Sequence, residues 1–250
     1  EEKEAGVALI DIGGGTTDLA IFKDGIIRHT AVIPFGGNVI TEDIKEGCSI
    51  IEKQAELLKV KFGSAWPNEN KENEIVSIPG LRGRDPKEIS LKNLSKIIHA
   101  RTVEIIEQVY LEIRNYGHEE QKKKLIAGIV LTGGGSQLKH LKQLVEYTTG
   151  MDTRVGYPNE HLAGDTDKSV TSPLYATAVG LLMDGLSKLE KNNSENPEIE
   201  NPEIENENES DDEEISSNDS EKIENKTKLP RESFLDKLTK NLQEFLDNAE

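Results

Sequence analysis

The stretch DIGGGTTD, residues 11–18, decides the fold, because it joins two apolar runs through three consecutive glycines. The run before it is GVALIDIG (6–13), and the runs after it are TDLAIFKDG (17–25) and IIRHTAVIP (26–34). Apolar segments of this length, separated by turn residues, are typical of consecutive strands. The dipeptide Asp24-Gly25 supplies the hairpin signal. We therefore predict a meander of three strands with a glycine loop between the first two.

The glycine loop has the chemistry of an anion site. Glycines 13–15 let backbone amides approach a ligand closely, and the hydroxyls of Thr16 and Thr17 can add donors to phosphate oxygens. Asp11, at the end of the predicted strand, is placed to hold a magnesium-bound water. For the glycines alone a tight hairpin without a ligand is the alternative. The flanking Asp and Thr residues favour phosphate.

A second glycine triplet, LTGGGS at residues 131–136, follows the buried-strand pattern IAGIVLT and precedes a predicted helix that Gly150 closes. The N-terminus of a helix suits phosphate or the polar edge of a nucleotide. The loop does not fit the GxGxxG spacing, so a dinucleotide-binding fold is not expected. The pair Gly36-Gly37 is either a strand-to-helix turn or a backbone wall of the same site.

The remaining apolar patterns predict further elements. Residues 35–63 fit two helices with a break at Gly47, and residues 63–89 read as loops around an edge strand at 75–78. A long helix follows, with Ser90 as its cap and Gly117 at its end. A short strand at 153–156 and a helix that starts at Pro173 complete the globular part.

Charge is distributed unevenly along the chain. Residues 190–230 hold fifteen acidic residues and four lysines, so they contribute −11 of the formal net charge of −17. Residues 1–189 are near neutral and show no basic stripe, which argues against nucleic acid as a partner. One cysteine, Cys48, excludes an internal disulfide and is expected to be a small buried residue in a reducing compartment. No run of eighteen apolar residues is present, so we expect no membrane-spanning helix.

The C-terminal region divides into a spacer and a tail. Residues 190–230 are rich in Asn, Glu, Pro and Ser and repeat NPEIE, a composition that predicts a disordered linker. Residues 231–250 regain a helical stripe. The stripe consists of Phe234, Leu235, Leu238, Leu242, Phe245 and Leu246.

Two motifs together resemble a known superfamily. DIGGGTTDLAIF and GIVLTGGGSQLKHL, in this order and about 120 residues apart, are similar to the second phosphate loop and the adenosine loop of the actin, sugar-kinase and heat-shock-chaperone proteins. PFGGNVITEDI and the run AELLK at 55–59 resemble the helix start and the adenine- and ribose-contacting helix of the bacterial members. TSPLYATAVGLL is similar to the last helix of the FtsA family in particular. The resemblance covers residues 5–187.

The resemblance implies an α/β fold, namely an actin-like (ribonuclease H-like) second lobe with a mixed sheet flanked by helices. The lobe would span residues 5–189, with a core subdomain at 5–62 and 125–189 and a smaller subdomain at about 63–124. The superfamily's first phosphate loop has no counterpart in this sequence. We therefore expect half of a two-lobed site, which binds ATP weakly and does not hydrolyse it.

For function, the resemblance implies a non-enzymatic cell-division scaffold that binds ATP with Mg²⁺. Such a protein self-associates into filaments and links FtsZ filaments to the inner face of the cytoplasmic membrane at the division site. Asp11 would act near the metal, through water. The nucleotide-binding residues that the resemblance implies are Asp11, Gly13, Gly14, Gly15, Thr16, Thr17, Gly36, Gly37, Glu56, Lys59, Gly133, Gly134, Gly135 and Ser136.

The family also implies two docking surfaces. The helix at 91–116 matches the FtsA element that binds the FtsZ C-terminal peptide, with Arg101, Lys92 and Lys96 as its cations, although the lysines also suit an ordinary solvated face. The tail stripe would lie on the membrane. Acidic residues outnumber basic ones there, so a protein groove and a solvent-exposed helix stay as alternatives.

Two other classes of function stay open. One is a phosphotransferase or ATPase of the same superfamily, such as a sugar kinase or chaperone. The chain lacks a substrate-binding domain after the second glycine loop, which counts against this class. The other is a pilus-assembly actin homologue, which would lack the FtsZ surface.

Overall fold

The computed structural model describes residues 1–71, 73–80, 85–159 and 170–195. Its main sheet has five strands in the order β3-β2-β1-β6-β7. The neighbours β1, β2 and β3 are antiparallel, whereas β6 runs parallel to both β1 and β7. The predicted meander and the mixed sheet are thus confirmed. The strands are β1 (Val7–Ile12), β2 (Thr17–Lys23), β3 (Ile26–Ile33), β6 (Ile129–Thr132) and β7 (Thr153–Val155).

The hairpin between β2 and β3 turns at Asp24-Gly25, as predicted. Both residues have positive φ, 55° and 77°, which suits a two-residue turn that follows the right-handed twist of the strands. A register shift between Ile21 and Phe22 interrupts the ladder further along.

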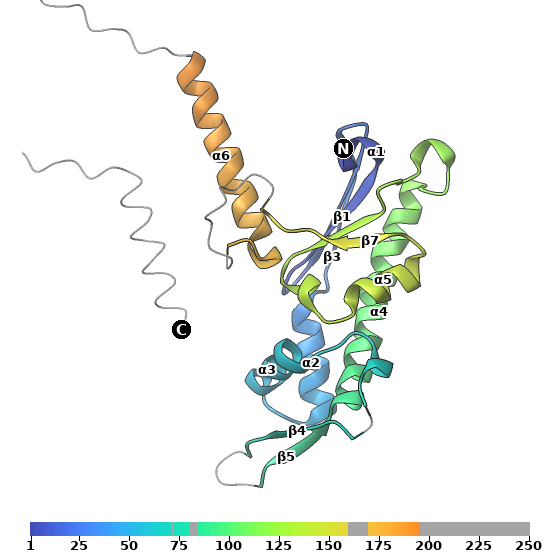
Figure 1. Cartoon of the computed structure of the whole chain (residues 1–250), viewed down its shortest axis with the longest axis vertical. Helices are drawn as coiled ribbons and strands as arrows, with labels where there is room; N and C mark the ends of the chain where they lie inside the picture. Colours follow the sequence, from blue (N-terminus) through green and yellow to red (C-terminus); the bar gives the residue numbers. More distant parts are fainter. Residues whose placement is uncertain (72, 81–84, 160–169, 196–250) are drawn as a thin grey trace, which may run out of the picture. The chain divides into compact units, whose positions relative to one another are not determined.

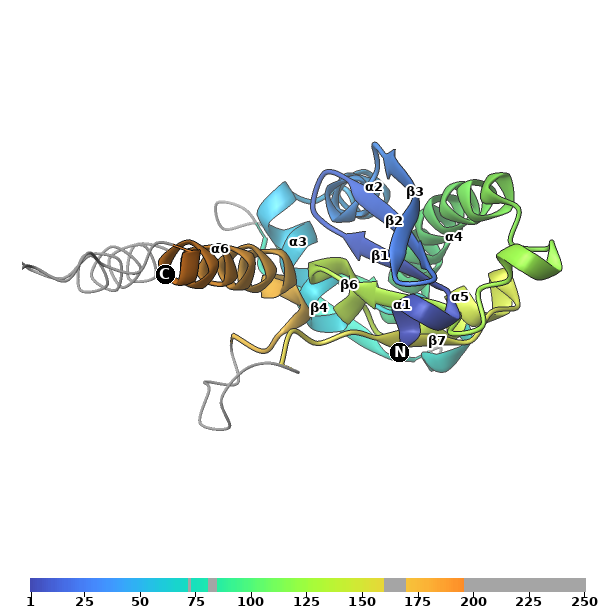
Figure 2. The same ribbon diagram turned by 90° about the horizontal axis from the view of Figure 1, so that it is seen from above.

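Besides the main sheet, the described residues form a two-stranded hairpin and several helices, of which the last extends away from the sheet (Figures 1 and 2). The hairpin pairs β4 (Ile75–Ile78) with β5 (Lys87–Ser90). The α-helices are α1 (Glu2–Ala5), α2 (Gly37–Cys48), α3 (Glu52–Phe62), α4 (Leu91–Tyr116), α5 (Leu141–Thr149) and α6 (Ala176–Glu195). The short 3₁₀ turns are η1 (Pro67–Glu69), η3 (Gln121–Lys123), η4 (Gly134–Gln137) and η5 (Pro173–Tyr175).

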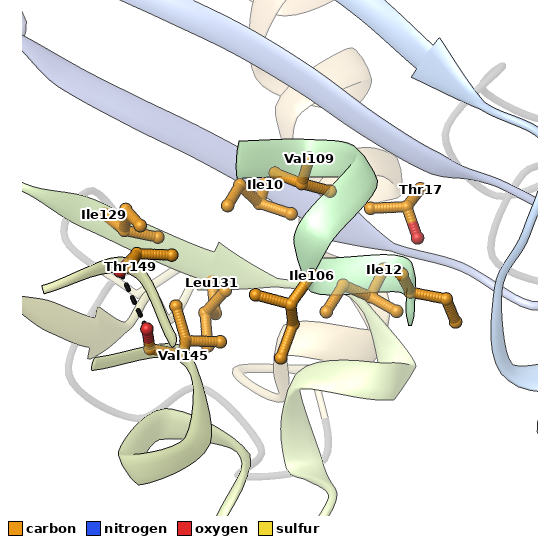
Figure 3. Close-up of a pocket in the computed structure, with 10 residues that line it drawn as sticks. Ile10, Ile12, Thr17, Ile106, Val109, Ile129, Leu131, Val145 and Thr149 are labelled. Carbon is orange, nitrogen blue, oxygen red and sulfur yellow. Dashed lines mark hydrogen bonds between the residues drawn. The ribbon is translucent and has the colours of Figure 1, made fainter. Parts of the chain in front are cut away.

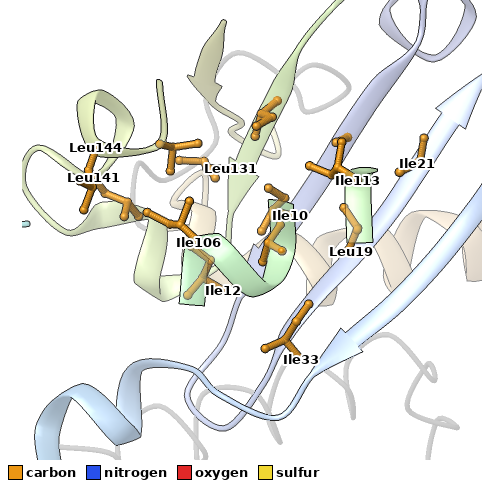
Figure 4. Close-up of a cluster of buried hydrophobic side chains, with 14 of the residues drawn as sticks. Ile10, Ile12, Leu19, Ile21, Ile33, Ile106, Ile113, Leu131, Leu141 and Leu144 are labelled. Atoms are coloured by element: carbon orange, nitrogen blue, oxygen red, sulfur yellow. The ribbon is translucent and has the colours of Figure 1, made fainter. Parts of the chain in front are cut away.

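One hydrophobic cluster lies between the sheet and helices α4 and α5 (Figure 4). Alternate residues of β1, such as Ile10 and Ile12, meet Ile106 and Ile113 of α4 there. An apolar void of about 10 Å³ remains in this layer, lined by Ile10, Ile129 and their neighbours (Figure 3). Because that volume is close to the minimum for one water and the lining is apolar, we interpret it as a packing defect.

A second hydrophobic cluster joins α2, α3, the β4–β5 hairpin and the N-terminal half of α4. Ile44, Leu58, Ile89 and Ile98 represent the four parts. Helix α4 therefore contributes to both clusters, since its later residues pack on the sheet. The predicted smaller subdomain at 63–124 stays a prediction. Buried side chains of α2 and α3, which precede it in the sequence, pack in the same cluster as residues of that region.

Two predicted helix ends and one predicted loop differ from the structure. Helix α2 runs through Gly47 and ends where Ser49 turns left-handed, at φ 48°. Gly47 serves close packing instead, because a Cβ there would lie 2.7 Å from Ile97 Cδ1. The partner strand β5 was predicted as loop. Helix α6 continues to Glu195, six residues past the predicted end of the lobe at 189.

Cys48 is buried and free, as expected, and burial raises the pKa of its thiol. Every helix in the described part of the chain is too short or too polar to span a bilayer. The predicted linker beyond Glu195 and the tail stripe at 231–250 lie outside the described residues.

Candidate functional site

The first glycine loop is a tight turn with free amides. The amide of Gly13 donates to the carbonyl of Thr16 at 2.9 Å, which closes the turn between β1 and β2. Within the described part of the chain, the amides of Gly14, Gly15 and Thr16 donate to no backbone carbonyl, and these three residues are exposed. A Cβ added at Gly15 would meet nothing within 4 Å. The loop can therefore offer consecutive N–H donors to an anion.

The two threonines of this loop have different surroundings. Thr17 is fully buried, and its Oγ1 donates to the carbonyl of Phe35 at 2.8 Å. The exposed Thr16 donates to Asp18 at 3.1 Å. Because the single proton of Thr17 is already used, this residue fastens the loop to the chain that enters α2. This differs from the predicted role of Thr17 as a phosphate donor.

The pair Gly36-Gly37 begins helix α2 directly against the first loop. The amides of Gly37 and Asn38 donate to the carbonyls of Gly13 and Gly14, at 2.9 and 2.8 Å. A Cβ on Gly36 would lie 2.6 Å from the Gly13 carbonyl oxygen, so only glycine allows this approach. The pair is thus both the strand-to-helix turn and a wall of the loop.

Glu56 and Lys59 of α3 meet the start of α2. Lys59 Nζ donates to the Gly37 carbonyl at 2.9 Å and to Thr41 Oγ1 at 2.7 Å, and it pairs with Glu56 at 2.7 Å. Burial would raise the pKa of Glu56, but hydrogen bonds from Lys59 and Thr41 outweigh it and lower that pKa. The structure therefore places Lys59 directly on the glycine wall, and it connects Glu56 to that wall through Lys59 and Thr41.

The second glycine loop is packed against the end of β1. Gly133 has φ 80°, and a Cβ there would overlap Asp11 Oδ1. A Cβ on Gly135 would overlap the side chain of Ile12. Ser136 is buried, and its hydroxyl donates to the Gly133 carbonyl at 2.7 Å. These residues bring the ends of β1 and β6 together, and the Ser136 hydroxyl is already used.

The loop does not open into a helix as predicted. Gly134–Gln137 form the 3₁₀ turn η4, and α5 begins only at Leu141. His140, in the left-handed conformation at φ 61°, is the N-cap residue of that helix. The dipole of α5 therefore starts several residues after the glycines, which changes the predicted source of anion affinity at this loop.

Asp11 lies at the meeting point of the two loops. It pairs in register with Asp18 on β2 and with Thr132 on β6, and its Oδ2 accepts a hydrogen bond from Thr177 of α6 at 2.8 Å. No cluster of three potential metal ligands occurs in the described ranges. Mg²⁺ commonly uses one or two carboxylates together with water and phosphate oxygens, so Asp11 fits that role without further protein ligands.

Comparison with known proteins decides the family. The family model for "Cell division protein FtsA" matches residues 8–180, which is more than half of the chain. The chain belongs to the FtsA family. It is 42% identical over 188 residues to cell division protein FtsA of Pseudomonas aeruginosa, covering 75% of this chain and 44% of that protein. It is 38% identical over 189 residues to Escherichia coli K12 FtsA, covering 74% and 44%. The chain thus spans less than half the length of these FtsA proteins.

Solved structures show the actin-like fold. MreB5 of Spiroplasma citri bound to ADP superposes with a TM-score of 0.59 at 24% identity, covering 78% of this chain and 57% of that one. The PilM–PilN type IV pilus biogenesis complex gives 0.55 at 19% identity, covering 74% and 47%. At these identities the likeness concerns the fold alone. The predicted actin-like lobe is confirmed.

Arg101, the cation predicted from the FtsA family, is already paired. Its Nε and Nη2 donate to the two carboxylate oxygens of Asp43 on α2, at 2.6 and 3.0 Å. Its Nη1 donates to Glu104 at 2.6 Å. The hydrogen bond with Asp43 is the largest of several effects that raise the pKa of Arg101.

Lys92 and Lys96 do not share a surface with Arg101. A helix turns about 100° per residue, so Arg101 lies on the opposite side of α4 from Lys92 and about 140° from Lys96. Lys96 is exposed, and Lys92 is partly buried. The three predicted cations of the FtsZ surface therefore do not form one patch on this helix. The predicted membrane residues 234–246 lie outside the described residues.

Sequence reasoning missed four residues of these sites: Asn38, Thr41, Asp43 and Thr177. Helical spacing could have found one of them. Thr41 is one turn after Gly37, and its hydroxyl lies 3.1 Å from that carbonyl. Asp43 follows two residues later, but its partner Arg101 is 58 residues away in the sequence. No sequence signal identifies that pairing, nor the one between Thr177 and Asp11.

Proposed function

We propose that this chain is the nucleotide-binding half of a cell-division scaffold that links FtsZ filaments to the inner face of the cytoplasmic membrane. One observation supports it most: in a member of the FtsA family, the ends of β1 and β6 hold two glycine loops side by side. The free amides of Gly14, Gly15 and Thr16 and the carboxylate of Asp11 lie there, and the Lys59–Glu56 pair contacts Gly37 beside the first loop. The arrangement suits a nucleotide with Mg²⁺.

Each group has a distinct task in this proposal. The free amides of Gly14 and Gly15 bind phosphate oxygens, and Asp11 orients water around the metal. Mg²⁺, when bound, neutralises phosphate charge. Lys59 holds the carbonyl of Gly37 and thereby keeps α2 against the loop. The MreB5 structure of the same fold contains ADP, which supports this choice of ligand.

The nucleotide acts as a structural switch in this proposal, and turnover is absent or slow. The related proteins are named for cell division rather than for a reaction. We assign no catalytic residue. ATP binding would control self-association into filaments through the shared surface of the two loops.

The link to FtsZ and the membrane uses two separate parts of the chain. Arg101 on α4 contacts acidic residues of the FtsZ C-terminal peptide, and the tail stripe at 234–246 lies on lipid. The tail has few cations, so apolar burial would provide most of its affinity.

Co-sedimentation tests the tether. The 250-residue chain is mixed with vesicles of phosphatidylglycerol and phosphatidylethanolamine and with a labelled FtsZ C-terminal peptide. A version that ends at Glu195 removes the tail but retains all of α6. Arg101→Glu is compared with Arg114→Glu, a matched charge reversal at an exposed position of the same helix.

We expect the tail to be required for lipid binding, and Arg101 but not Arg114 for peptide binding. If the truncated version still binds lipid and Arg101→Glu still binds the peptide, the tether is refuted. Equilibrium titration with ATP and Mg²⁺ then tests the nucleotide site, for which we expect weak, metal-dependent binding.

A further inference from the structure

We propose that Asp43 is an internal competitor for Arg101: its carboxylate occupies the guanidinium edge that an acidic peptide would use, and so weakens and selects that partner. The inference rests on the proposed function, because it concerns the same Arg101 site. It adds a specificity-determining residue on α2, a different helix from the one that carries the cation.

The geometry of the pair is that of a bound ligand. A guanidinium recognises carboxylate through two parallel N–H donors, and Arg101 uses Nε and Nη2 in this way on Asp43, at 2.6 and 3.0 Å. Nη1 is directed to Glu104 at 2.6 Å. Three of the five N–H donors are therefore engaged. A carboxylate from another chain must displace Asp43 to obtain the same two-point contact.

The pair is accessible enough to exchange. The side chains of Arg101 and Asp43 retain 25% and 27% of their exposure to solvent. Water can therefore stabilise either group when the other leaves, unlike in a fully buried pair. The Glu104 side chain is 48% exposed and adds a second negative charge beside the cation. Both carboxylates repel an approaching acidic ligand.

Asp43 is also held in place before any ligand arrives. Its neighbours Thr41 and Ile44 are buried, and α2 begins with two hydrogen bonds to the first glycine loop. Close packing of Gly47 against Ile97 of α4 fixes the far end of the helix. A competitor that is tethered and oriented acts at high effective concentration, so a weakly acidic partner cannot displace it.

Peptide titration tests the competition in the complete 250-residue chain. The probe is the FtsZ C-terminal peptide, measured by fluorescence anisotropy at low salt. We expect Asp43→Asn to tighten binding about fivefold, because one repulsive charge and one competing acceptor are removed. Glu42→Gln makes the same change of charge one residue earlier, where the carboxylate pairs with Lys45. It should leave the affinity nearly unchanged.

Two further variants distinguish this inference from the proposed peptide binding at Arg101. Arg101→Ala should abolish peptide binding, and the gain from Asp43→Asn should vanish when both substitutions are combined. If Arg101→Ala leaves peptide binding unchanged, the proposed peptide site is wrong, and the proposed competition by Asp43 is refuted as well. If Arg101→Ala abolishes binding but Asp43→Asn weakens it or has no effect, Arg101 is the peptide site and Asp43 is not a competitor.

A measurement on the unmodified chain covers the case in which Asp43→Asn fails to fold. The side-chain Nε–H resonance of Arg101 reports its acceptor. We expect that resonance to shift in proportion to bound peptide as Asp43 is displaced. Saturation with peptide and an unmoved Arg101 resonance would overturn the proposal.

Discussion

Two glycine triplets in this chain have the same letters and opposite surroundings. At the first, Gly14 and Gly15 are exposed and their amides donate to no backbone carbonyl of the described residues, and an added Cβ at Gly15 would meet nothing within 4 Å. At the second, an added Cβ at Gly133 or Gly135 would overlap residues of β1. The first triplet leaves space for a ligand, whereas the second allows the ends of β1 and β6 to pack closely together.

The difference shows that a glycine loop can serve binding in two ways. Gly14 and Gly15 can present donors themselves. Gly133 and Gly135 act indirectly, because they allow the end of β6 to pack closely against Asp11 and Ile12. Substitutions at the two loops should therefore affect different properties, namely stability at the second and affinity at the first.

The largest expected effect is at the packed loop. Gly133→Ala should lower the free energy of unfolding by about 3 kcal/mol or more, because φ 80° with ψ 169° is a glycine-only conformation and the new methyl overlaps Asp11. Gly150→Ala is the matched control. Gly150 also has positive φ, 69°, but open space around it, so about 1 kcal/mol is expected. Equal losses in urea denaturation would show that backbone strain alone accounts for the second triplet.

A smaller effect is expected at the open loop. Gly15→Ala should change the unfolding free energy by no more than about 0.5 kcal/mol, since the added methyl contacts nothing. It should weaken Mg·ATP binding by about tenfold, or about 1.4 kcal/mol, because the methyl occupies the approach to the free amides. Gly180→Ala on α6, also surrounded by open space, is the control. Unchanged ATP affinity in Gly15→Ala would remove the first loop from the binding site.

The smallest expected effect concerns the Lys59–Glu56 pair, which supports Gly37 beside the first loop. The folded pKa of Glu56 lies below its ordinary value of 4.5, so its contribution is complete above that value and is lost as pH falls through the folded pKa. We expect Glu56→Gln to cost less than about 1 kcal/mol at pH 7, because Glu56 is half exposed. The difference from the unmodified chain should shrink below pH 4.5 in thermal melts. A difference that grows towards acid would contradict the lowered pKa.

Local patterns predicted much of the fold and part of the site. Alternating apolar residues and Asp24-Gly25 predicted the meander, and the apolar stripe ending at Gly117 predicted helix α4 with its end. The resemblance assigned Glu56 and Lys59 to the nucleoside, which stays a prediction, and the structure has Lys59 on the carbonyl of Gly37. The strand β5 escaped prediction because its run KEIS is polar and gains order from pairing with β4.

By itself, the sequence determined most of the elements, the family and the two glycine triplets, because these depend on residues close together along the chain. Only the tertiary structure decided which hydroxyls and cations are free. Thr17, Ser136 and Arg101 all look available in sequence, yet each already has a partner. Two of those partners, Phe35 and Asp43, are 18 and 58 residues away. Hydrogen bonds and ion pairs act between neighbours in space, and the packing of α2 against the loop and α4 decides which residues become neighbours.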